Sequence, residues 1–223
     1  MINAILYVTK GGIPWRLLPR EFPPWKTVYH LFRKWVCERT WESINSFLRA
    51  LVRAQVGKRS RPTGAILDSQ SVKSAAHSGR VGYDAAKRIK GRKRHILVDT
   101  LGLLLGIRVT PASTPEREGA YGLLEGILGW CSWLRRIWTD GGYEGEGFEN
   151  WIKSVRPQLK VQIVKRPDLA GGFHPLPRRW VVERTFAWFM SHRRLVRDYE
   201  ATESSAEAFA YIAMIRIQLG RLA

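Results

Sequence analysis

The spacing of apolar residues changes near residue 60, and this change constrains the fold more than any other feature of the chain. Before it, apolar side chains recur roughly every three to four residues, as on amphipathic helices. One such stripe contains Val28, Leu31, Phe32, Trp35 and Val36, and a second contains Trp41, Ile44, Phe47, Leu48 and Leu51. We therefore predict two helices within residues 1–55, with Thr27 as the N-cap of the first.

Residues 57–64, GKRSRPTG, are interpreted as a basic linker. After it, the apolar stretches are short and separated by turn residues, a pattern typical of strands. Five stretches are predicted as strands, with a tight turn at Leu101 and Gly102 between the second and the third. These stretches are residues 65–73, 94–102, 103–111, 135–143 and 160–166.

Helical patterns occupy the rest of this half of the chain. One helix is predicted between the third and fourth strands, starting at Ser113 or Thr114 ahead of Pro115 and continuing to Leu128. Two more helical regions cover residues 178–196 and 205–222. This order predicts an α/β fold with a mixed sheet flanked by helices. We expect residues 1–56 to form an N-terminal helical region and residues 65–223 to form the sheet domain.

The charge of the chain points to a polyanionic partner. Its 223 residues include 37 Lys and Arg against 19 Asp and Glu, a net charge of +18 that is spread over the whole sequence. A hydrophobic content of 45% supports a folded core and excludes a disordered basic tail. Nucleic acid is the first candidate, since no apolar run reaches the roughly 18 residues that a membrane-spanning helix needs. Cys37 and Cys131 lack the spacing of a zinc site or a disulfide framework.

Two aspartates stand where an α/β sheet places reactive groups. Asp68 lies within the first predicted strand, and Asp140 ends the fourth strand just before two glycines. In open sheets, reactive groups gather where strands end and the strand order reverses. An aspartate before glycine also ends strands or caps turns for structural reasons alone, and the residues leave that alternative open.

A third acid, Glu183, stands alone in a basic helix. From Arg178 to Arg197 the sequence holds six arginines and this one acid. A helix advances about 100° per residue, so Arg179 and Glu183 share one sector beside an apolar face. A surface ion pair between them is the ordinary explanation. The alternative explanation is a bound metal ion, because Asp68, Asp140 and Glu183 would repel one another in a single pocket unless a cation neutralised them. Carboxylate oxygens select Mg²⁺ or Mn²⁺, the ions that catalyse phosphodiester chemistry.

Several motifs occur together and in order along nearly the whole chain. They are PWRLLPREFPPWKTVYHLFRKW in the N-terminal part, ILDSQSVK around Asp68, GRKRHILVDTLGLLLGIRVTPAS from Gly91 to Ser113, WTDGGYEG around Asp140 and RRWVVERTFAWF through Glu183. With these motifs the chain resembles bacterial insertion-sequence transposases of the Asp-Asp-Glu class, in the type-five insertion-sequence family. The resemblance implies a ribonuclease H-like catalytic domain over residues 65–223.

The resemblance also implies residue roles. Asp68, Asp140 and Glu183 correspond to the catalytic triad, which binds two divalent ions, Mg²⁺ or Mn²⁺. Arg179 matches the arginine of the family's Tyr-Arg-Glu-Lys signature and is expected to contact DNA.

The rest of that signature departs from the family pattern. Leu176 stands at the tyrosine position and Met190 at the lysine position. We expect Arg193 or Arg194 to supply the phosphate contact that the missing lysine would make.

A basic cluster between the first and second predicted strands is the other candidate DNA contact. From Arg80 to His95 it holds one acid, Asp84, against seven basic residues. Such a run is often only a solvated face, but beside a metal site it would follow a DNA backbone without reading sequence. The basic residues are Arg80, Lys87, Arg88, Lys90, Arg92, Lys93 and Arg94.

The function implied by the resemblance is metal-dependent cleavage and transfer of DNA strands at insertion-sequence ends. The expected partner is double-stranded DNA, namely the terminal inverted repeats and the target, bound by a homodimer near the nucleoid in the bacterial cytoplasm. Relatives generally carry further sequence ahead of NAILYVTKGGIPWRLLP, whereas Met1 nearly abuts it here, so a shortened copy is expected. The alternatives are a catalytically silent DNA-binding derivative that acts as an inhibitor or repressor, and a ribonuclease H-fold nuclease.

Overall fold

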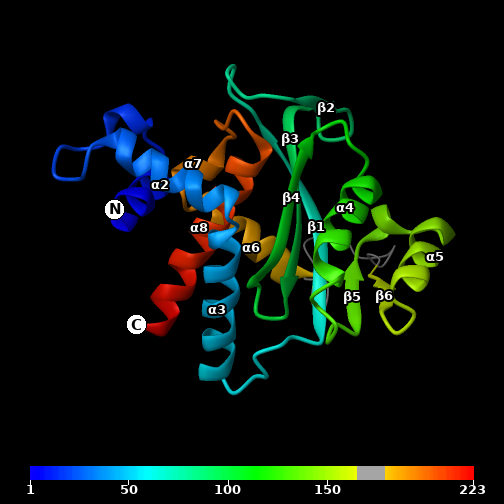
Figure 1. Cartoon of the computed structure of the whole chain (residues 1–223). Coiled ribbons are helices and arrows are strands. Elements are labelled where there is room, and N and C mark those ends of the chain that lie inside the picture. Colours follow the sequence, from blue (N-terminus) through cyan, green and yellow to red (C-terminus); the bar gives the residue numbers. More distant parts are fainter. Residues whose placement is uncertain (165–178) are drawn as a thin grey trace.

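The computed structural model of this chain describes residues 1–164 and 179–223. It has an α/β fold in which a mixed six-stranded sheet lies between two layers of helices, so the predicted fold class is confirmed (Figure 1). The strands follow the order β2-β3-β1-β5-β6, and β4 also pairs with β3. Their bounds are β1 Gly64–Lys73, β2 Gly82–Asp84, β3 Ile89–Asp99, β4 Leu104–Pro111, β5 Arg136–Thr139 and β6 Lys160–Ile163.

The strand directions divide the sheet into an antiparallel and a parallel half. β1, β3 and β4 are antiparallel neighbours, and the long β3–β4 hairpin turns at Gly102. Gly102 has a φ of 80°, and a Cβ there would approach the Thr185 hydroxyl oxygen within 2.8 Å, so glycine is required. β5 runs parallel to β1, and β6 parallel to β5. This arrangement is consistent with a ribonuclease H-like fold.

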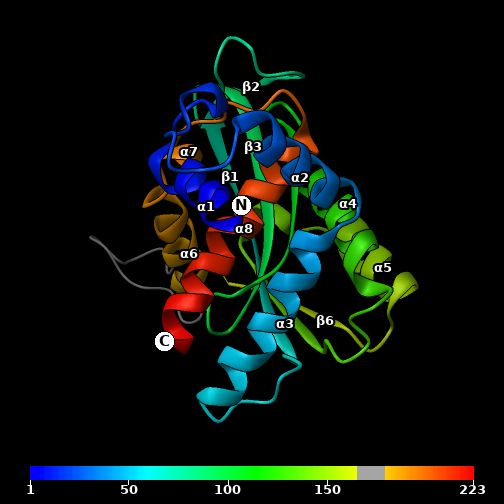
Figure 2. The ribbon, with the colours of Figure 1, turned by 60° about the vertical axis from the view of Figure 1, so that its left-hand side comes forward.

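Helices cover both faces of the sheet. α4 and α5 pack on one side, and helices from both ends of the chain pack on the other, where α3 and α8 run side by side (Figures 1 and 2). None of the described helices is long and apolar enough to cross a membrane. The helix bounds are α1 Ile2–Gly11, α2 Trp25–Cys37, α3 Thr40–Gln55, α4 Glu116–Leu128, α5 Glu146–Val155, α6 Trp180–Met190, α7 Arg193–Val196 and α8 Glu203–Leu222, with short 3-10 turns η1 Trp15–Leu17 and η2 Gly141–Tyr143.

Successive side chains along the strands point to opposite faces of the sheet and belong to two separate hydrophobic cores. Ile66 and Ile96 belong to the core under the N-terminal and C-terminal helices, whereas Leu67 and Leu97 belong to the core under α4 and α5. The N-terminal helices are an integral part of the first core, since the rings of Phe32 and α8 residue Phe209 stack with centroids 4.9 Å apart. The predicted N-terminal helical region therefore packs directly on the sheet domain.

The structure corrects several sequence-based expectations. Thr27 is not an N-cap, because α2 begins at Trp25 directly after Pro24. Pro115 takes the N-cap position of α4 in place of Ser113 or Thr114. In both cases the helix starts right after a proline, whose missing N–H loses no intrahelical bond there.

Other elements were not predicted at all, or were predicted as longer units. α1, β2 and α5 were missed, and the helical region after residue 178 is divided into α6 and α7 by a turn at Ser191 and His192. The predicted strand residues 165–166, the helix position 178 and Leu176 lie outside the described residues.

The free edge of β4 is covered by polar side chains. The Leu104 carbonyl accepts hydrogen bonds from Asn45 and Arg49 of α3, each at 2.9 Å, and the Val109 N–H donates to Glu207 of α8 at 2.9 Å. Edge strands otherwise offer unpaired backbone groups to other chains. Side chains of two helices thus satisfy backbone groups near both ends of this edge.

An ion pair fastens α3 to the β3–β4 hairpin. Arg53 contacts the Asp99 carboxylate at 2.6 Å, and both side chains are buried. The other Asp99 oxygen accepts the N–H groups of Leu101 and Leu103, at 2.8 and 2.9 Å, and so fixes the turn. Asp99 therefore holds the hairpin and the N-terminal helices together.

We expect Arg53→Met to lower the free energy of unfolding by about 3–5 kcal/mol, because it leaves the buried Asp99 charge without a partner. The double variant Arg53→Met with Asp99→Asn should recover part of this loss. Urea unfolding measures both, with Lys34→Met, which removes an exposed ion pair to Glu38, as the control. A single variant no less stable than that control would contradict the assignment.

Stability should also depend on pH through Glu207. Burial raises the pKa of Glu207 from 4.5 to about 7. Between these values the folded state holds a proton that the unfolded state has lost, so stability falls as pH rises from about 4.5 through 7. Glu207→Gln should remove about 1–3 kcal/mol of that fall while still accepting the Val109 N–H. Parallel pH curves of the two proteins would disprove this.

Candidate active site

The parallel pairing of β1 with β5 brings two predicted site residues together. Ile66 of β1 is paired with Trp138 of β5. Asp68 comes two residues after Ile66, and Asp140 comes two residues after Trp138. Asp68 and Asp140 therefore lie side by side on one face, at the spacing of neighbouring strands, about 4.8 Å. That is the face which α6 covers.

Arg179, at the start of α6, lies between the two carboxylates. Its guanidinium nitrogen Nη2 is 3.7 Å from Asp68 Oδ2 and 3.5 Å from Asp140 Oδ2, and the side chain is only 15% exposed. These distances exceed those of a close two-bond contact between an arginine and a carboxylate. One cation thus offsets two acids through a loose contact.

Glu183 is placed differently from the two aspartates. It lies one helical turn after Arg179, on the same side of α6, but its side chain is exposed. The Glu183 carboxylate makes no hydrogen bond or ion pair with another described residue. Within residues 1–164 and 179–223, no three His, Cys, Asp or Glu side chains form a group that could hold a metal ion. The structure thus brings together two of the three predicted catalytic residues.

The surroundings of Asp68 favour its protonated form. Burial raises the pKa of Asp68 from 3.8 to about 6, and the charge of Asp140 adds to this effect. The Ser69 N–H, 2.7 Å from Asp68 Oδ1, and the Arg179 guanidinium act in the opposite direction. A carboxyl group with this pKa readily exchanges its proton for another cation near neutral pH.

The Asp-Gly-Gly motif has a specific geometry. Asp140 accepts the Gly142 N–H at 2.9 Å and thereby caps η2. A Cβ at Gly142 would lie 2.5 Å from Glu116 Oε2 and 3.1 Å from Asp140 Oδ1. A side chain at position 142 would therefore displace the Glu116 carboxylate from its present position.

Glu116 is a further acid at this site that the sequence did not reveal. It accepts a hydrogen bond from the Ser69 hydroxyl at 2.8 Å and contacts Lys87 Nζ at 3.1 Å. Burial alone would raise the pKa of Glu116, but Ser69 and Lys87 outweigh it and the pKa lies below the usual value. A glutamate in the first turn of a helix has an ordinary explanation in the helix dipole, so its sequence position gave no signal.

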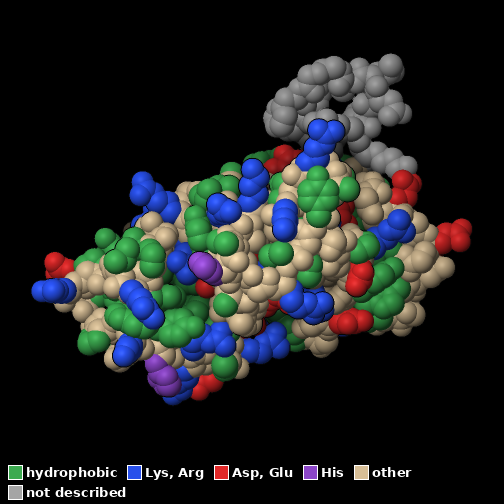
Figure 3. Space-filling model, turned by 90° about the horizontal axis from the view of Figure 1, so that it is seen from above, with side chains coloured by type: hydrophobic (Ala, Val, Ile, Leu, Met, Phe, Trp, Pro, Cys, Tyr) green, Lys and Arg blue, Asp and Glu red, His purple; other side chains and the backbone are tan. Residues whose placement is uncertain are grey.

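The predicted DNA-contacting residues separate into two groups. Lys87, Arg88, Lys90 and Arg193 are exposed, although Lys87 is paired with Glu116. On the face shown in Figure 3, Lys and Arg side chains are spread over the surface and do not form one block. The exposed members are therefore available to a polyanion.

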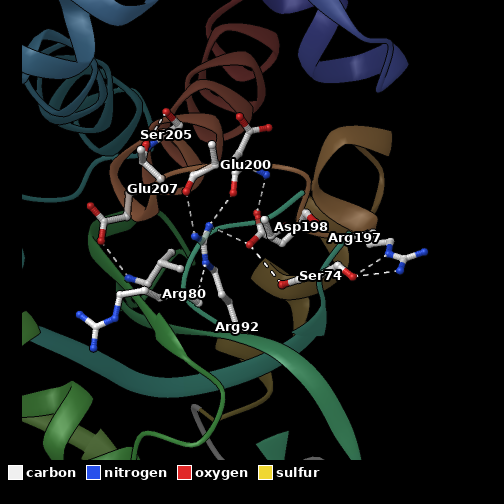
Figure 4. Close-up of polar contacts among 12 residues, drawn as sticks. Ser74, Arg80, Arg92, Arg197, Asp198, Glu200, Ser205 and Glu207 are labelled. Carbon is white, nitrogen blue, oxygen red and sulfur yellow. Dashed lines mark hydrogen bonds and ion pairs between the residues drawn. The ribbon is translucent and has the colours of Figure 1, made fainter. Parts of the chain in front are cut away.

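The second group is buried, so the structure does not present these side chains to DNA. Arg92 donates to the Asp198 carboxylate at 3.0 Å and to the Glu200 carbonyl at 2.9 Å (Figure 4). Arg194 contacts the Glu200 carboxylate at 2.7 Å. Lys93 and Arg94 are buried in the same way, with bonds to the carbonyls of Thr114 and Leu195. Successive basic side chains along β3 point to opposite faces of the sheet, and other parts of the chain cover both faces.

Replacing Arg179 should destabilise the protein in a pH-dependent way. Arg179→Gln leaves Asp68 and Asp140 without their shared cation, and we expect a loss of about 1 kcal/mol at pH 8. The loss should shrink at pH 5, below the Asp68 pKa of about 6, where the carboxyl group is protonated. Chemical denaturation at both pH values tests this, with the exposed Arg193→Gln as control. An equal loss at pH 5 and pH 8 would contradict it.

Comparison with known protein families assigns nearly the whole chain. The family described as Transposase DDE domain matches residues 59–217, and a family described as a transposase of the IS4/5 family matches residues 1–45. A search of curated proteins found no match. The two matches confirm the resemblance drawn from the sequence motifs. The chain belongs to the DDE transposase family, with the N-terminal region of IS4/5-family transposases.

Proposed function

We propose that this transposase cleaves and transfers DNA strands at the ends of an insertion sequence, and that Asp68, Asp140 and Glu183 form its catalytic centre. The observation that carries the proposal is the pair of aspartates on one sheet face with a single cation between them. Two carboxylates held side by side, one of them with a raised pKa, suit cation binding better than they suit stability.

The donor set fits Mg²⁺ or Mn²⁺. Carboxylate oxygens are the ligands that these ions prefer, and Arg179 already shows that a positive charge is accommodated between Asp68 and Asp140. Asp68 and Asp140 would hold the metal, and Glu183 would join them from α6. Divalent ions in such a site activate an attacking hydroxyl and stabilise the leaving oxygen.

The chain's own residues would orient the DNA. Because its contacts to the aspartates are loose, Arg179 can turn toward a DNA phosphate once another cation neutralises the pair. In cleavage, a water oxygen bonds to phosphorus, the bond from phosphorus to the 3′-oxygen breaks, and that oxygen leaves as a 3′-hydroxyl. In strand transfer, the oxygen of this hydroxyl loses its proton and bonds to a target phosphorus, and the bond from that phosphorus to the target's own 3′-oxygen breaks. The target strand is left with a free 3′-hydroxyl, and no covalent bond to the protein forms.

One observation favours a second function, that of a catalytically silent DNA-binding derivative. Glu183 is exposed and belongs to no described metal-binding group. In the catalytic proposal, α6 must bring Glu183 toward the aspartates when metal and DNA bind. In the silent alternative, Glu183 stays at the surface.

Nicking of labelled DNA separates these possibilities. Purified protein with Mg²⁺ should nick a duplex that carries the element's terminal repeat, and Asp68→Asn, Asp140→Asn and Glu183→Gln should each reduce the rate by about 10³-fold or more. Glu118→Gln, an exposed acid in the first turn of α4, is the matched control and should retain activity.

Each outcome decides between the functions. Nicking that survives the aspartate changes would refute the catalytic assignment, and nicking that survives only Glu183→Gln would remove Glu183 from the centre. Wild-type protein that binds DNA without nicking would support the silent derivative. Preferential cleavage of the RNA strand of a hybrid would support a ribonuclease H-fold nuclease.

A further inference from the structure

A concentration of basic side chains lies where β1 and β5 begin, on the N-terminal side of Asp68 along β1. A hollow of about 740 Å³ is lined by the chain that connects α3 to β1 and by the first residues of β1 and β5. These segments lie at the lower end of the sheet in Figure 1. No Asp or Glu among the described residues lines it. Its basic residues are Arg53, Lys58, Arg59, Arg61, Arg135 and Arg136.

Five of these six cations have no acidic partner among the described residues. Arg53 is paired with Asp99, whereas Lys58 and Arg59 are exposed, and their side chains form no hydrogen bond or ion pair with a described residue. Arg135 donates only to neutral oxygens, those of Ser132 and Gln158. Like charges gathered in this way repel one another, and a bound anion would relieve the repulsion.

Two of the arginines are held in place by aromatic rings. The Arg61 guanidinium lies 4.9 Å from the centroid of the Trp133 ring, and Arg136 lies 5.9 Å from that of Trp138. Stacking leaves the planar N–H groups free to bind an anion and reduces the ordering that binding requires. Planar guanidinium groups match the geometry of phosphate oxygens.

The hollow is close enough to the aspartates to share one duplex with them. Gly64, at its rim, precedes Asp68 by four residues of β1, which corresponds to about 13 Å. One turn of B-DNA is about 34 Å long, so a duplex with a phosphate at the aspartates can also place backbone phosphates at the hollow.

We propose that this hollow is a second DNA site, which anchors the phosphate backbone of duplex DNA without reading its sequence. The proposal rests on the proposed function for the choice of DNA as the polyanion. It assigns a role to the basic connection between α3 and β1, separate from the exposed residues Lys87, Arg88 and Lys90.

A pair of charge reversals tests the site. Arg59→Glu with Arg61→Glu alters the hollow, and Lys34→Glu with Lys153→Glu makes the same change in net charge at two exposed, acid-paired lysines of α2 and α5. Fluorescence anisotropy in EDTA, across a range of salt concentrations, measures binding to two labelled duplexes. One duplex carries the element's terminal repeat and the other an unrelated sequence.

The hollow variant should bind both duplexes about tenfold or more weakly, and the slope of log affinity against log salt should fall by about 2. The control variant should stay close to wild type. An equal effect of the two variants, or an unchanged salt slope, would overturn the proposal, as would a loss confined to the terminal repeat. The neutral pair Arg59→Gln with Arg61→Gln should show the same direction and guards against misfolding of the reversed pair.

Nicking distinguishes this proposal from the catalytic one. At saturating protein, the hollow variant should nick DNA with Mg²⁺ at the wild-type rate, because its aspartates are unchanged. Wild-type protein that fails to nick while the hollow variant still loses affinity would refute only the catalytic proposal. Normal nicking by a hollow variant of unchanged affinity would refute only the second DNA site.

Discussion

Repulsion between two carboxylates is the constraint around which this protein's candidate active site is arranged. Asp68 and Asp140 face the same way because of the register of β1 and β5, and burial raises the pKa of Asp68 because it disfavours the charged form. Arg179 offsets both from a single position on α6. The strands therefore determine where the charges meet, and the helix supplies the cation that lies between them.

Much of this arrangement could be predicted from the sequence. The period of apolar residues located five of the six strands and most helices, because burial on one or both faces imposes a regular pattern. The two aspartates were recognised by their place at strand positions and by the motifs around them. β2 was missed because its three residues are too few to show a period. α5 does carry helical spacing, at Phe148, Trp151, Ile152 and Val155, which the sequence analysis did not use.

The surface charges were less predictable, for a physical reason. A run of basic residues from Arg88 to Arg94 looks like one binding face, but a strand sends successive side chains to opposite faces, and both faces of β3 are covered. Asp198, whose carboxylate pairs with Arg92, lies more than a hundred residues further along the chain. Glu116 escaped notice for a similar reason, since its partner Ser69 comes from a distant strand.

The packing of α3 against α8 has a consequence for how the protein folds during its synthesis. These helices lie far apart in the sequence, yet they share one core, and each forms a hydrogen bond with the outer edge of β4. While the ribosome is still synthesising the middle of the chain, α8 is missing from that core and cannot bond to the edge of β4. The apolar side chains of the N-terminal helices therefore stay partly exposed until α8 has been synthesised. Exposed apolar surface of this kind is what chaperones bind.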